Sequence, residues 1–201
     1  MARDTSPIVK QSRREGVALH PKAHKVLARK SGIPGQHGQG RQGKQSMYAT
    51  QLREKQKVRR MYGLLEKQFA KLMNEATRKP GLSGENLLQM LELRLDNTVY
   101  RAGFATSRRG ARQLVSHGHF ELNGRRVDIP SIRVKAGDVI TLKEKSKSNT
   151  SVTSQVRAKN PKFGWIDFNE TEFKGTFITY PERENVPENI KESLIVELYN
   201  K

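Results

Sequence analysis

The chain has 201 residues, enough for one or two domains with a modest core. Its 38 Lys and Arg residues against 20 Asp and Glu residues give a net charge of +18, more than solubility requires, which indicates a polyanionic partner. The absence of cysteine excludes disulfides and thiolate metal sites. No apolar run is long enough to span a membrane and no secretory signal is present, so we expect a cytoplasmic protein with no membrane partner.

The positive charge is concentrated in two parts of the chain. Residues 1–60 carry 15 basic and 3 acidic residues, and residues 92–145 carry 11 and 6. Residues 61–91 are nearly neutral, and residues 146–201 carry 8 basic and 8 acidic residues. We therefore expect nucleic-acid contacts in the first 60 residues and in the central segment, and packing or protein contacts in the C-terminal quarter.

Residues 1–45 have little apolar periodicity, many basic residues and a glycine-rich loop at 31–45. Such a segment buries too little apolar surface to offset its chain entropy, so we expect an arm that is largely disordered in solution and becomes ordered on RNA. The glycines suggest phosphate contact, although no P-loop is present. His20, His24 and His37 have no paired metal-ligand spacing and are expected at the surface or on RNA.

Ser46 is suited to cap a helix that ends at Gly63. Two rows of cations follow this helix, one with Arg53, Lys57 and Arg60 and one with Lys55 and Arg59. Their mutual repulsion would be relieved by RNA, which favours a contact surface; the alternative is a basic helix that is merely solvated. Leu65, Phe69, Leu72, Met73 and Ala76 then predict an amphipathic core helix that ends before Pro80-Gly81.

One apolar stripe, at Leu87, Leu91, Leu95 and Val99, predicts a continuous helix ending at Gly103, with Arg94 and Arg101 on another face. A second helix, capped by Thr106 or Ser107, should run to about His117. It would pack Ala111, Leu114 and Val115. Its other face would carry Arg108, Arg109, Arg112, Gln113 and Ser116, without any acid.

After Gly118 the periodicity changes from helix to strand. Phe120 and Leu122 alternate with polar residues, Asn123-Gly124 is typical of a type I′ hairpin turn, and a strand through Val127 and Ile129 should follow. A third strand is predicted at residues 139–142. The helices and hairpin would form a concave basic corner suited to a phosphate backbone, the alternative being solvated arginines.

Beyond Lys145 the chain is polar until Phe163, Trp165 and Phe168, which we expect to pack against the sheet rather than on RNA. Ile190, Leu194 and Leu198 predict a C-terminal helix that returns to the helices at 46–78. The predicted domains are an arm at 1–45, a helical domain at 46–90 completed by about 175–201, an RNA-binding module at 91–154 and a connecting segment at 155–174.

The RNA-binding candidates are the cations and polar residues of these surfaces: Arg13, Arg14, Lys44, Arg53, Lys55, Lys57, Arg59, Arg60, Arg94, Arg101, Arg108, Arg109, Arg112, Gln113, His117, His119, Arg125, Arg126 and Arg133.

Several motifs stand out in the central segment and along the rest of the chain: IPGQHG at 33–38, LREKQKVRRMYG at 52–63, RLDN at 94–97, SRRGARQLVSHGH at 107–119, NGRRVDIPS at 123–131, VKAGD at 134–138, YPER at 180–183 and the closing LIVELYNK. Together these motifs resemble those of the family of the fourth protein of the bacterial small ribosomal subunit.

The resemblance implies an α+β protein: a helical domain of N-terminal helices plus the C-terminal helix, an inserted two-helix and small-sheet RNA-binding module of alpha-L type, and a basic arm. It also implies early binding of small-subunit ribosomal RNA, assembly of the subunit body, translational accuracy, and contact with neighbouring proteins, especially the fifth. Some members bind zinc through a Cys-x-x-Cys pair near the N-terminus. Here Val9 and Ser12 occupy those positions, so we predict no zinc and no other cofactor.

Other functions are weaker alternatives. Related modules occur in pseudouridine synthases, but the residues around the module leave too little room for a catalytic domain, and no nucleophile and base set is recognisable. We therefore expect neither an enzyme nor a small-molecule substrate. The two-helix unit superficially resembles a DNA-binding helix-turn-helix, yet several separate basic surfaces favour folded RNA. A general RNA chaperone and a messenger-binding role remain open.

Overall fold

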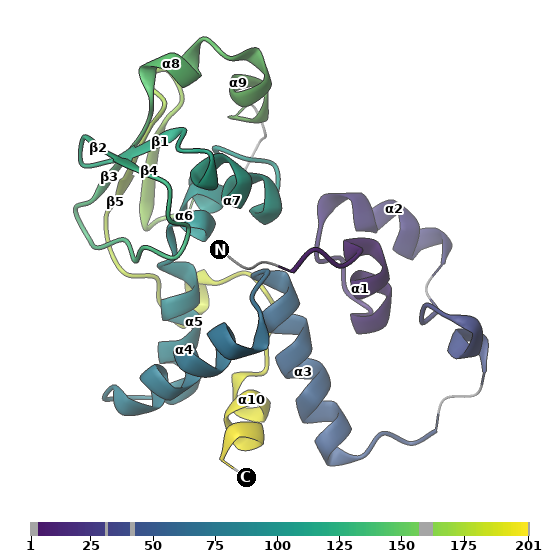
Figure 1. The fold of residues 1–201 in the computed structure, drawn as a ribbon. Coiled ribbons are helices and arrows are strands. Elements are labelled where there is room, and N and C mark those ends of the chain that lie inside the picture. The colour runs from purple at the N-terminus through teal and green to yellow at the C-terminus, as the bar shows by residue number, and fades with distance from the viewer. Residues whose placement is uncertain (1–3, 31, 41–42, 157–162, 201) are drawn as a thin grey trace. The chain divides into compact units, whose positions relative to one another are not determined.

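The computed structural model describes residues 4–30, 32–40, 43–156 and 163–200. These residues form two compact units (Figure 1). The helical unit comprises residues 1–84 and 188–201, and the sheet unit comprises residues 85–187. The sheet unit is thus inserted into the sequence of the helical unit, which agrees with the predicted α+β architecture. The exact domain boundaries expected from the sequence remain a prediction.

Within its described residues, the helical unit consists of helices and one short 3-10 turn. Its elements are α1 (Ile8–Glu15), α2 (Pro21–Arg29), η1 (Gln36–Gln39), α3 (Met47–Met61), α4 (Glu66–Arg78), the first residues of α5 (Ser83–Glu92), and α10 (Glu192–Tyr199). The hydroxyl of Ser46 accepts a hydrogen bond from the Ala49 N–H, so the predicted N-cap of α3 is confirmed. The apolar face of α4, with Phe69, Leu72, Met73 and Ala76, is buried as predicted.

The C-terminal helix packs on α3, which confirms the predicted return of the chain. The amide of Gln51 on α3 donates to the Glu197 carboxylate of α10 at 2.8 Å. The helix itself begins later than expected, at Glu192, and its fully buried residue is Ile195 rather than Leu194 or Leu198. Ile190 is buried ahead of the helix, so the apolar pattern crosses the helix start.

The sheet unit contains the remaining elements: most of α5, α6 (Leu95–Ala102), α7 (Arg108–Ser116), β1 (Phe120–Leu122), β2 (Arg125–Val127), β3 (Val139–Leu142), α8 (Glu144–Lys147), α9 (Thr150–Val156), β4 (Ile166–Asn169), β5 (Lys174–Phe177) and η2 (Arg183–Asn185). Its five strands are all antiparallel, in the order β2-β1-β3-β5-β4.

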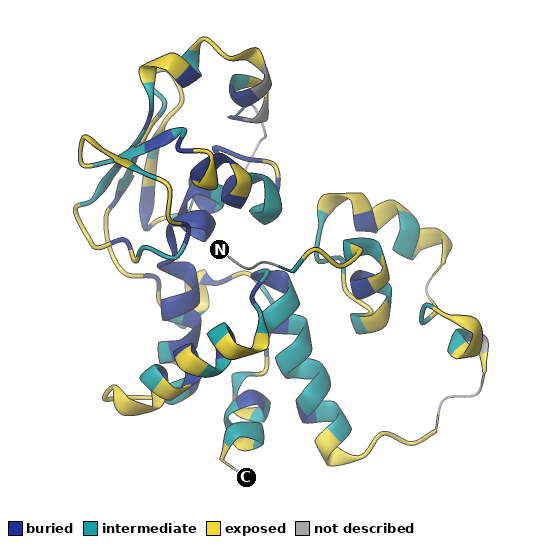
Figure 2. Cartoon of the chain, viewed as in Figure 1, coloured by how far each residue is buried: buried dark blue, intermediate teal, exposed yellow. Residues whose placement is uncertain are grey.

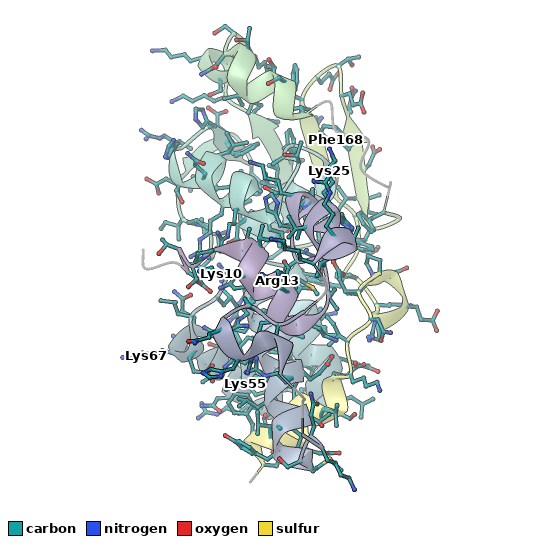
Figure 3. The ribbon with its side chains drawn as sticks, turned by 90° about the vertical axis from the view of Figure 1, so that its right-hand side faces the viewer. Lys10, Arg13, Lys25, Lys55, Lys67 and Phe168 are labelled. Carbon is teal, nitrogen blue, oxygen red and sulfur yellow. The ribbon has the colours of Figure 1, made fainter. Side chains whose placement is uncertain are left out.

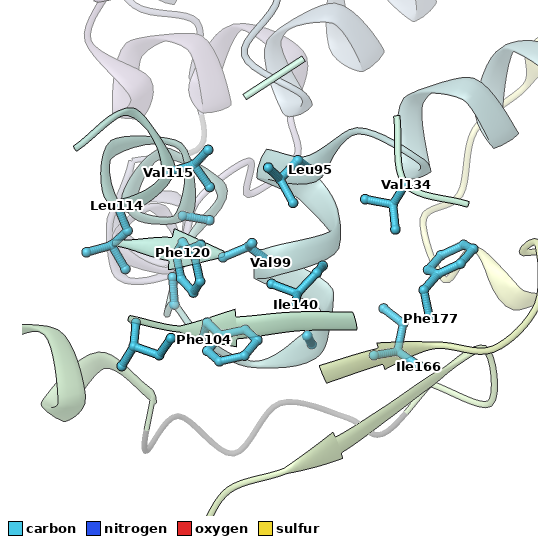
Figure 4. Close-up of a cluster of buried hydrophobic side chains, with 14 of the residues drawn as sticks. Leu95, Val99, Phe104, Leu114, Val115, Phe120, Val134, Ile140, Ile166 and Phe177 are labelled. Carbon is cyan, nitrogen blue, oxygen red and sulfur yellow. The ribbon is translucent and has the colours of Figure 1, made fainter. Parts of the chain in front are cut away.

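The core of the sheet unit lies between α6, α7 and the sheet (Figure 4). Leu95 and Val99 of α6 and Leu114 of α7 meet Phe120 of β1 and Ile140 of β3 there. Almost every residue of α6 is buried (Figure 2), so this helix forms the centre of the unit rather than a surface.

The predicted single helix over residues 87–102 is wrong, because it is divided into α5 and α6 at Leu93-Arg94. Arg94 has an extended backbone, with φ −68° and ψ 136°. The segment 130–134 competes for the backbone groups there: the Leu95 N–H donates to the Ile132 carbonyl, and the Val134 N–H donates to the Leu93 carbonyl. A short strand-like pairing, Arg94 with Arg133, therefore replaces one helical turn.

The hairpin turn at Asn123-Gly124 is confirmed, since both residues have positive φ, 50° and 75°. The second strand ends at Val127, and Ile129, expected within it, is exposed. The segment expected to connect the domains contributes β4, and β5 lies beyond it, where the helical domain was expected to resume. Trp165 is 3% exposed within the core, which confirms its packing role.

Candidate nucleic-acid interface

The second helix of the sheet unit, α7, presents a cationic face to solvent. The Ser107 hydroxyl accepts from the Gly110 N–H at 3.2 Å and caps its N-terminus. Ala111, Leu114 and Val115 are buried, which leaves Arg109, Gln113 and His117 on the accessible side. The helix contains no acidic residue. This face can therefore receive phosphates without competition from carboxylates of α7.

The hairpin adds a further cation, Arg126, beside the end of α7. Gly118 has a φ of 70°, which lets the chain leave the helix. A β-carbon at Gly118 would lie 2.9 Å from the Arg126 Nε, so the guanidinium of Arg126 lies directly on this glycine. Arg125 and Arg126 are both exposed on β2. The structure thus brings Arg126 to the C-terminal end of the α7 face.

His119 is less suited to a charged contact than its sequence position indicated. Its Nδ1 lies 2.9 Å from the Ser146 hydroxyl, and the residue is half-buried. Burial lowers the pKa of His119 below its usual value, and the nearby His117 lowers it further. The ring is therefore neutral at physiological pH and offers a hydrogen bond rather than a charge.

Three predicted contact arginines are not on a solvent face. Arg94 donates to both oxygens of Asp96, at 3.2 and 3.0 Å, and Arg112 lies 3.7 Å from the same carboxylate. Arg101 donates to both oxygens of Glu92, at 2.9 and 2.7 Å. All three arginines are at least about nine-tenths buried. We correct these assignments: acids two, nine and sixteen residues away bind Arg94, Arg101 and Arg112, respectively, inside the unit, because buried charges require partners.

Arg108 occupies the boundary between this interior and the surface. Its Nε donates to the Asn97 amide oxygen at 2.8 Å, and its guanidinium carbon lies 4.8 Å from the Tyr100 ring centre. The side chain is half-exposed. Arg133 is exposed, and its backbone forms the bridge to Arg94.

In the helical unit, the cations of α3 are paired with acids. The buried Glu15 carboxylate binds Arg53, at 3.1 Å, and Arg60. Burial raises the pKa of Glu15, and the coulombic attraction of Arg53 and Arg60 opposes that rise. Arg53 and Arg60 therefore anchor α1 to α3 and cannot be assigned to RNA alone.

The second row of α3 pairs with α4. Lys55 donates to Glu66 at 2.6 Å, and Arg59 lies 3.7 Å from the same carboxylate. Burial raises the pKa of Glu66, but hydrogen bonds from Lys55 and Tyr199 outweigh it, so the net pKa is lowered. Lys57 binds Glu54 at 2.7 Å. These cations are partly exposed, and the repulsion expected along α3 is relieved at least in part by acids of the chain itself.

The arm contains more order than its composition indicated, since α1 and α2 both lie within it. Arg13 donates to the carbonyl oxygen of Gly32 at 2.9 Å, whereas Arg14 and Lys44 are exposed. Figure 3 shows Lys10 and Arg13 carried by α1, and Lys25 by α2. Parts of the glycine-rich loop, residues 31 and 41–42, lie outside the described residues. Disorder of the free arm stays a prediction.

Two family descriptions match consecutive parts of the chain. Residues 3–92 match the ribosomal protein S4/S9 N-terminal domain, and residues 93–140 match the S4 domain. Small ribosomal subunit protein uS4 of Chlorobium limicola is 50% identical over 203 residues, and that of Cytophaga hutchinsonii is 51% identical over 202, with all of both chains covered in each case. That of Thermoanaerobacter is 49% identical over 207 residues, again with full coverage.

The chain belongs to the uS4 family. Members of this family are structural, non-enzymatic ribosomal proteins, and this chain is not an enzyme. The match of the S4 domain to residues 93–140 assigns an RNA-binding domain to the part of the sheet unit that contains α6, α7 and the hairpin.

The positions at which some uS4 members carry zinc ligands do not fit a metal here. Val9 has no donor atom. The Ser12 hydroxyl is fully buried, donates to the Ile8 carbonyl at 2.8 Å and accepts from the Leu19 N–H at 3.2 Å. These two positions therefore supply no zinc ligand. Among the described residues, no three His, Asp or Glu side chains are grouped to hold a metal ion, and no helix could cross a membrane.

Sequence reasoning did not identify Asn97 and Tyr100 as part of this interface. Both contact Arg108, although neither is charged. The sequence did contain one signal. Two acids and two arginines lie close together in the apolar stretch at 91–102, and charges within such a stretch must be paired inside the protein.

Proposed function

We propose that this chain binds folded small-subunit ribosomal RNA mainly through the α7 face and the adjoining hairpin. The observation that carries the proposal is the arrangement of Arg108, Arg109, Gln113 and His117 on an acid-free helix, with Arg126 held on Gly118 at its end. Such a surface clamps phosphates without reading a base sequence. The partly exposed cations of α3 and the arm, including Arg14 and Lys44, form a second contact surface.

The finer part of the proposal concerns assembly. A protein that neutralises phosphates on several separate surfaces can hold RNA helices together that would otherwise repel one another. We infer that the chain binds early, at a multi-helix junction, and nucleates assembly of the subunit body. Its basic N-terminal 60 residues and its basic central segment support this role.

A contribution to translational accuracy would require contact with neighbouring proteins, especially the fifth protein of the subunit, and concerted action with the twelfth. The neutral C-terminal quarter supports such a contact, because it competes least for RNA. Glu184, Glu188 and Glu192 are our candidates. Their charge reversal should alter accuracy in a reporter assay; unchanged accuracy would count against this interface.

The test of RNA binding is a titration of purified small-subunit ribosomal RNA, transfer RNA and duplex DNA over a salt series, with crosslinks mapped on both molecules. We expect preference for the ribosomal RNA, with crosslinks from residues 44–60 and 101–133. Arg108→Ala should reduce the salt slope by roughly one unit. Arg112→Ala should act through loss of folding instead, because its partner Asp96 is buried.

The second candidate is a general RNA chaperone or accessory protein outside the ribosome, favoured by the high net charge alone. Weak, equal binding to all three nucleic acids, with a steep salt dependence, would support that role and contradict ours. Equal affinity for duplex DNA and structured RNA would also revive the helix-turn-helix interpretation. Binding to messenger RNA and a cytoplasmic location stay predictions.

A further inference from the structure

A chain of hydrogen bonds leads from a buried carboxylate to an arginine at the surface. The Glu92 side chain is completely buried, and its two oxygens accept hydrogen bonds from two nitrogens of Arg101, Nε and Nη2. The Asn97 Nδ2 donates to Glu92 Oε2 at 2.7 Å, and the Asn97 Oδ1 accepts from Arg108 Nε at 2.8 Å. Both ends of the Asn97 amide are therefore engaged, one inside the unit and one at its boundary.

The chemistry of the two partners fixes the orientation of this amide. A carboxylate can only accept hydrogen bonds and a guanidinium can only donate them. The amide nitrogen of Asn97 must therefore face Glu92, and its oxygen must face Arg108. An aspartate at position 97 would place a second carboxylate beside Glu92, and an apolar residue would satisfy neither partner.

The ring of Tyr100 restrains Arg108 from a second side. The Arg108 guanidinium carbon lies 4.8 Å from the ring centre, and that of Arg101 lies 5.9 Å from the same ring. Arg101 also lies 4.9 Å from the ring centre of Phe163. Guanidinium groups over aromatic faces are attracted to them. A hydrogen bond to Asn97 and the ring of Tyr100, both from α6, thus restrain Arg108 before any ligand is present.

We propose that Asn97 is a positioning residue for RNA binding. Its amide is fixed by the buried Glu92–Arg101 pair and in turn fixes the guanidinium of Arg108 by a hydrogen bond. The Arg108 guanidinium is thereby held where an RNA phosphate meets the start of α7. A restrained arginine loses less rotamer freedom on binding than a mobile one, so the restraint increases affinity without adding a contact to RNA. This inference rests on the proposed function of the α7 face.

The test is a double-mutant cycle with purified small-subunit ribosomal RNA at fixed salt, comparing Asn97→Ala, Arg108→Ala and the double variant. We expect each single change to weaken binding on the order of tenfold, and Asn97→Ala to have less than about a twofold effect once Arg108 is absent. Equal effects of Asn97→Ala in both backgrounds would overturn the proposal, because Asn97 would then not act through Arg108.

Thr98→Val is the matched control for a purely structural role. The Thr98 hydroxyl donates to the carbonyl oxygens of Glu92 and Arg94, in the same buried cluster, and no hydrogen bond joins it to Arg108. This variant should lower stability and leave the affinity of the folded protein unchanged. A loss of affinity as large as that of Asn97→Ala would also overturn the proposal. The thermal unfolding curve of each variant gives the fraction that is folded at the temperature of the binding assay.

A second readout does not depend on RNA. The Arg108 Nε–H resonance should exchange slowly with solvent in the native protein and faster in Asn97→Ala; equal exchange would contradict the positioning role. If the alanine variant does not fold, Asn97→Ser keeps a polar group that is too short to reach both partners.

If Arg108→Ala itself leaves RNA binding unchanged, the proposed function of this face fails, whatever the exchange rates are.

Discussion

Removal of the buried arginine Arg101 should destabilise the sheet unit far more than removal of an exposed one. The side chains of Glu92 and Arg101 are 0% and 4% exposed, and they form two hydrogen bonds at 2.9 and 2.7 Å. Arg101→Ala leaves the Glu92 carboxylate inside the unit without its bidentate partner. Breaking a buried pair in this way costs about 3–5 kcal/mol, a large part of the total stability of an ordinary domain.

The assay is urea unfolding of Arg101→Ala beside Arg125→Ala, followed by far-ultraviolet circular dichroism. Arg125 is exposed on β2, so its replacement should change the unfolding free energy by less than about 0.5 kcal/mol. Arg125→Ala should instead weaken RNA binding at unchanged stability. Equal unfolding midpoints for the two variants would refute the assignment of Arg101 to the interior.

Three further changes test other parts of the structure. Leu114→Ala should cost roughly 2–5 kcal/mol of unfolding free energy, because Leu114 is 6% exposed in the core; the solvent-side change Ser116→Ala is its control, and similar losses in both would contradict this packing. Because burial lowers the pKa of His119, the unfolded state binds the proton first, so stability should fall as the pH drops below about 6.5. The same pH profile in His119→Gln would disprove that origin. Gly38→Ala should disrupt the loop at 33–38, since a β-carbon there would overlap the Ile33 carbonyl oxygen; unchanged amide spectra of this loop would contradict the close approach. Gly43→Ala is the control, because a β-carbon at Gly43 would meet no atom within 4 Å.

Features that depend on neighbouring residues along the chain could be predicted from the sequence. Ser46 and Ser107 cap helices, and Asn123-Gly124 forms the hairpin turn, because each uses hydrogen bonds or backbone angles within four residues. The exposed positions of Gln113 and Ser116 on α7 likewise follow from helical periodicity. The family resemblance rested on motifs along the whole chain, two of which contain Ser107 and Asn123-Gly124, and it is confirmed by relatives that match over the full length.

Features that depend on distant residues could not be predicted. The apolar stripe through Leu91 and Leu95 continues across the break at Arg94, but backbone groups at 130–134 interrupt the helix there. β4 and β5 are recognisable only by their pairing with each other and with β3. Periodicity also places Arg112 and Gln113 together on the polar face of α7. In the structure Gln113 is exposed, whereas Arg112 is buried and forms an ion pair with Asp96.

The insertion of the sheet unit into the helical unit has a consequence for the order of folding during synthesis. α3 packs on α10, yet 130 residues separate Met61 from Glu192. At about 5–20 residues per second, α3 waits on the order of ten seconds for its partner. All residues of the sheet unit, 85–187, are synthesised within that interval. The nascent chain can therefore complete its RNA-binding unit while α3 still exposes the side on which α10 will pack.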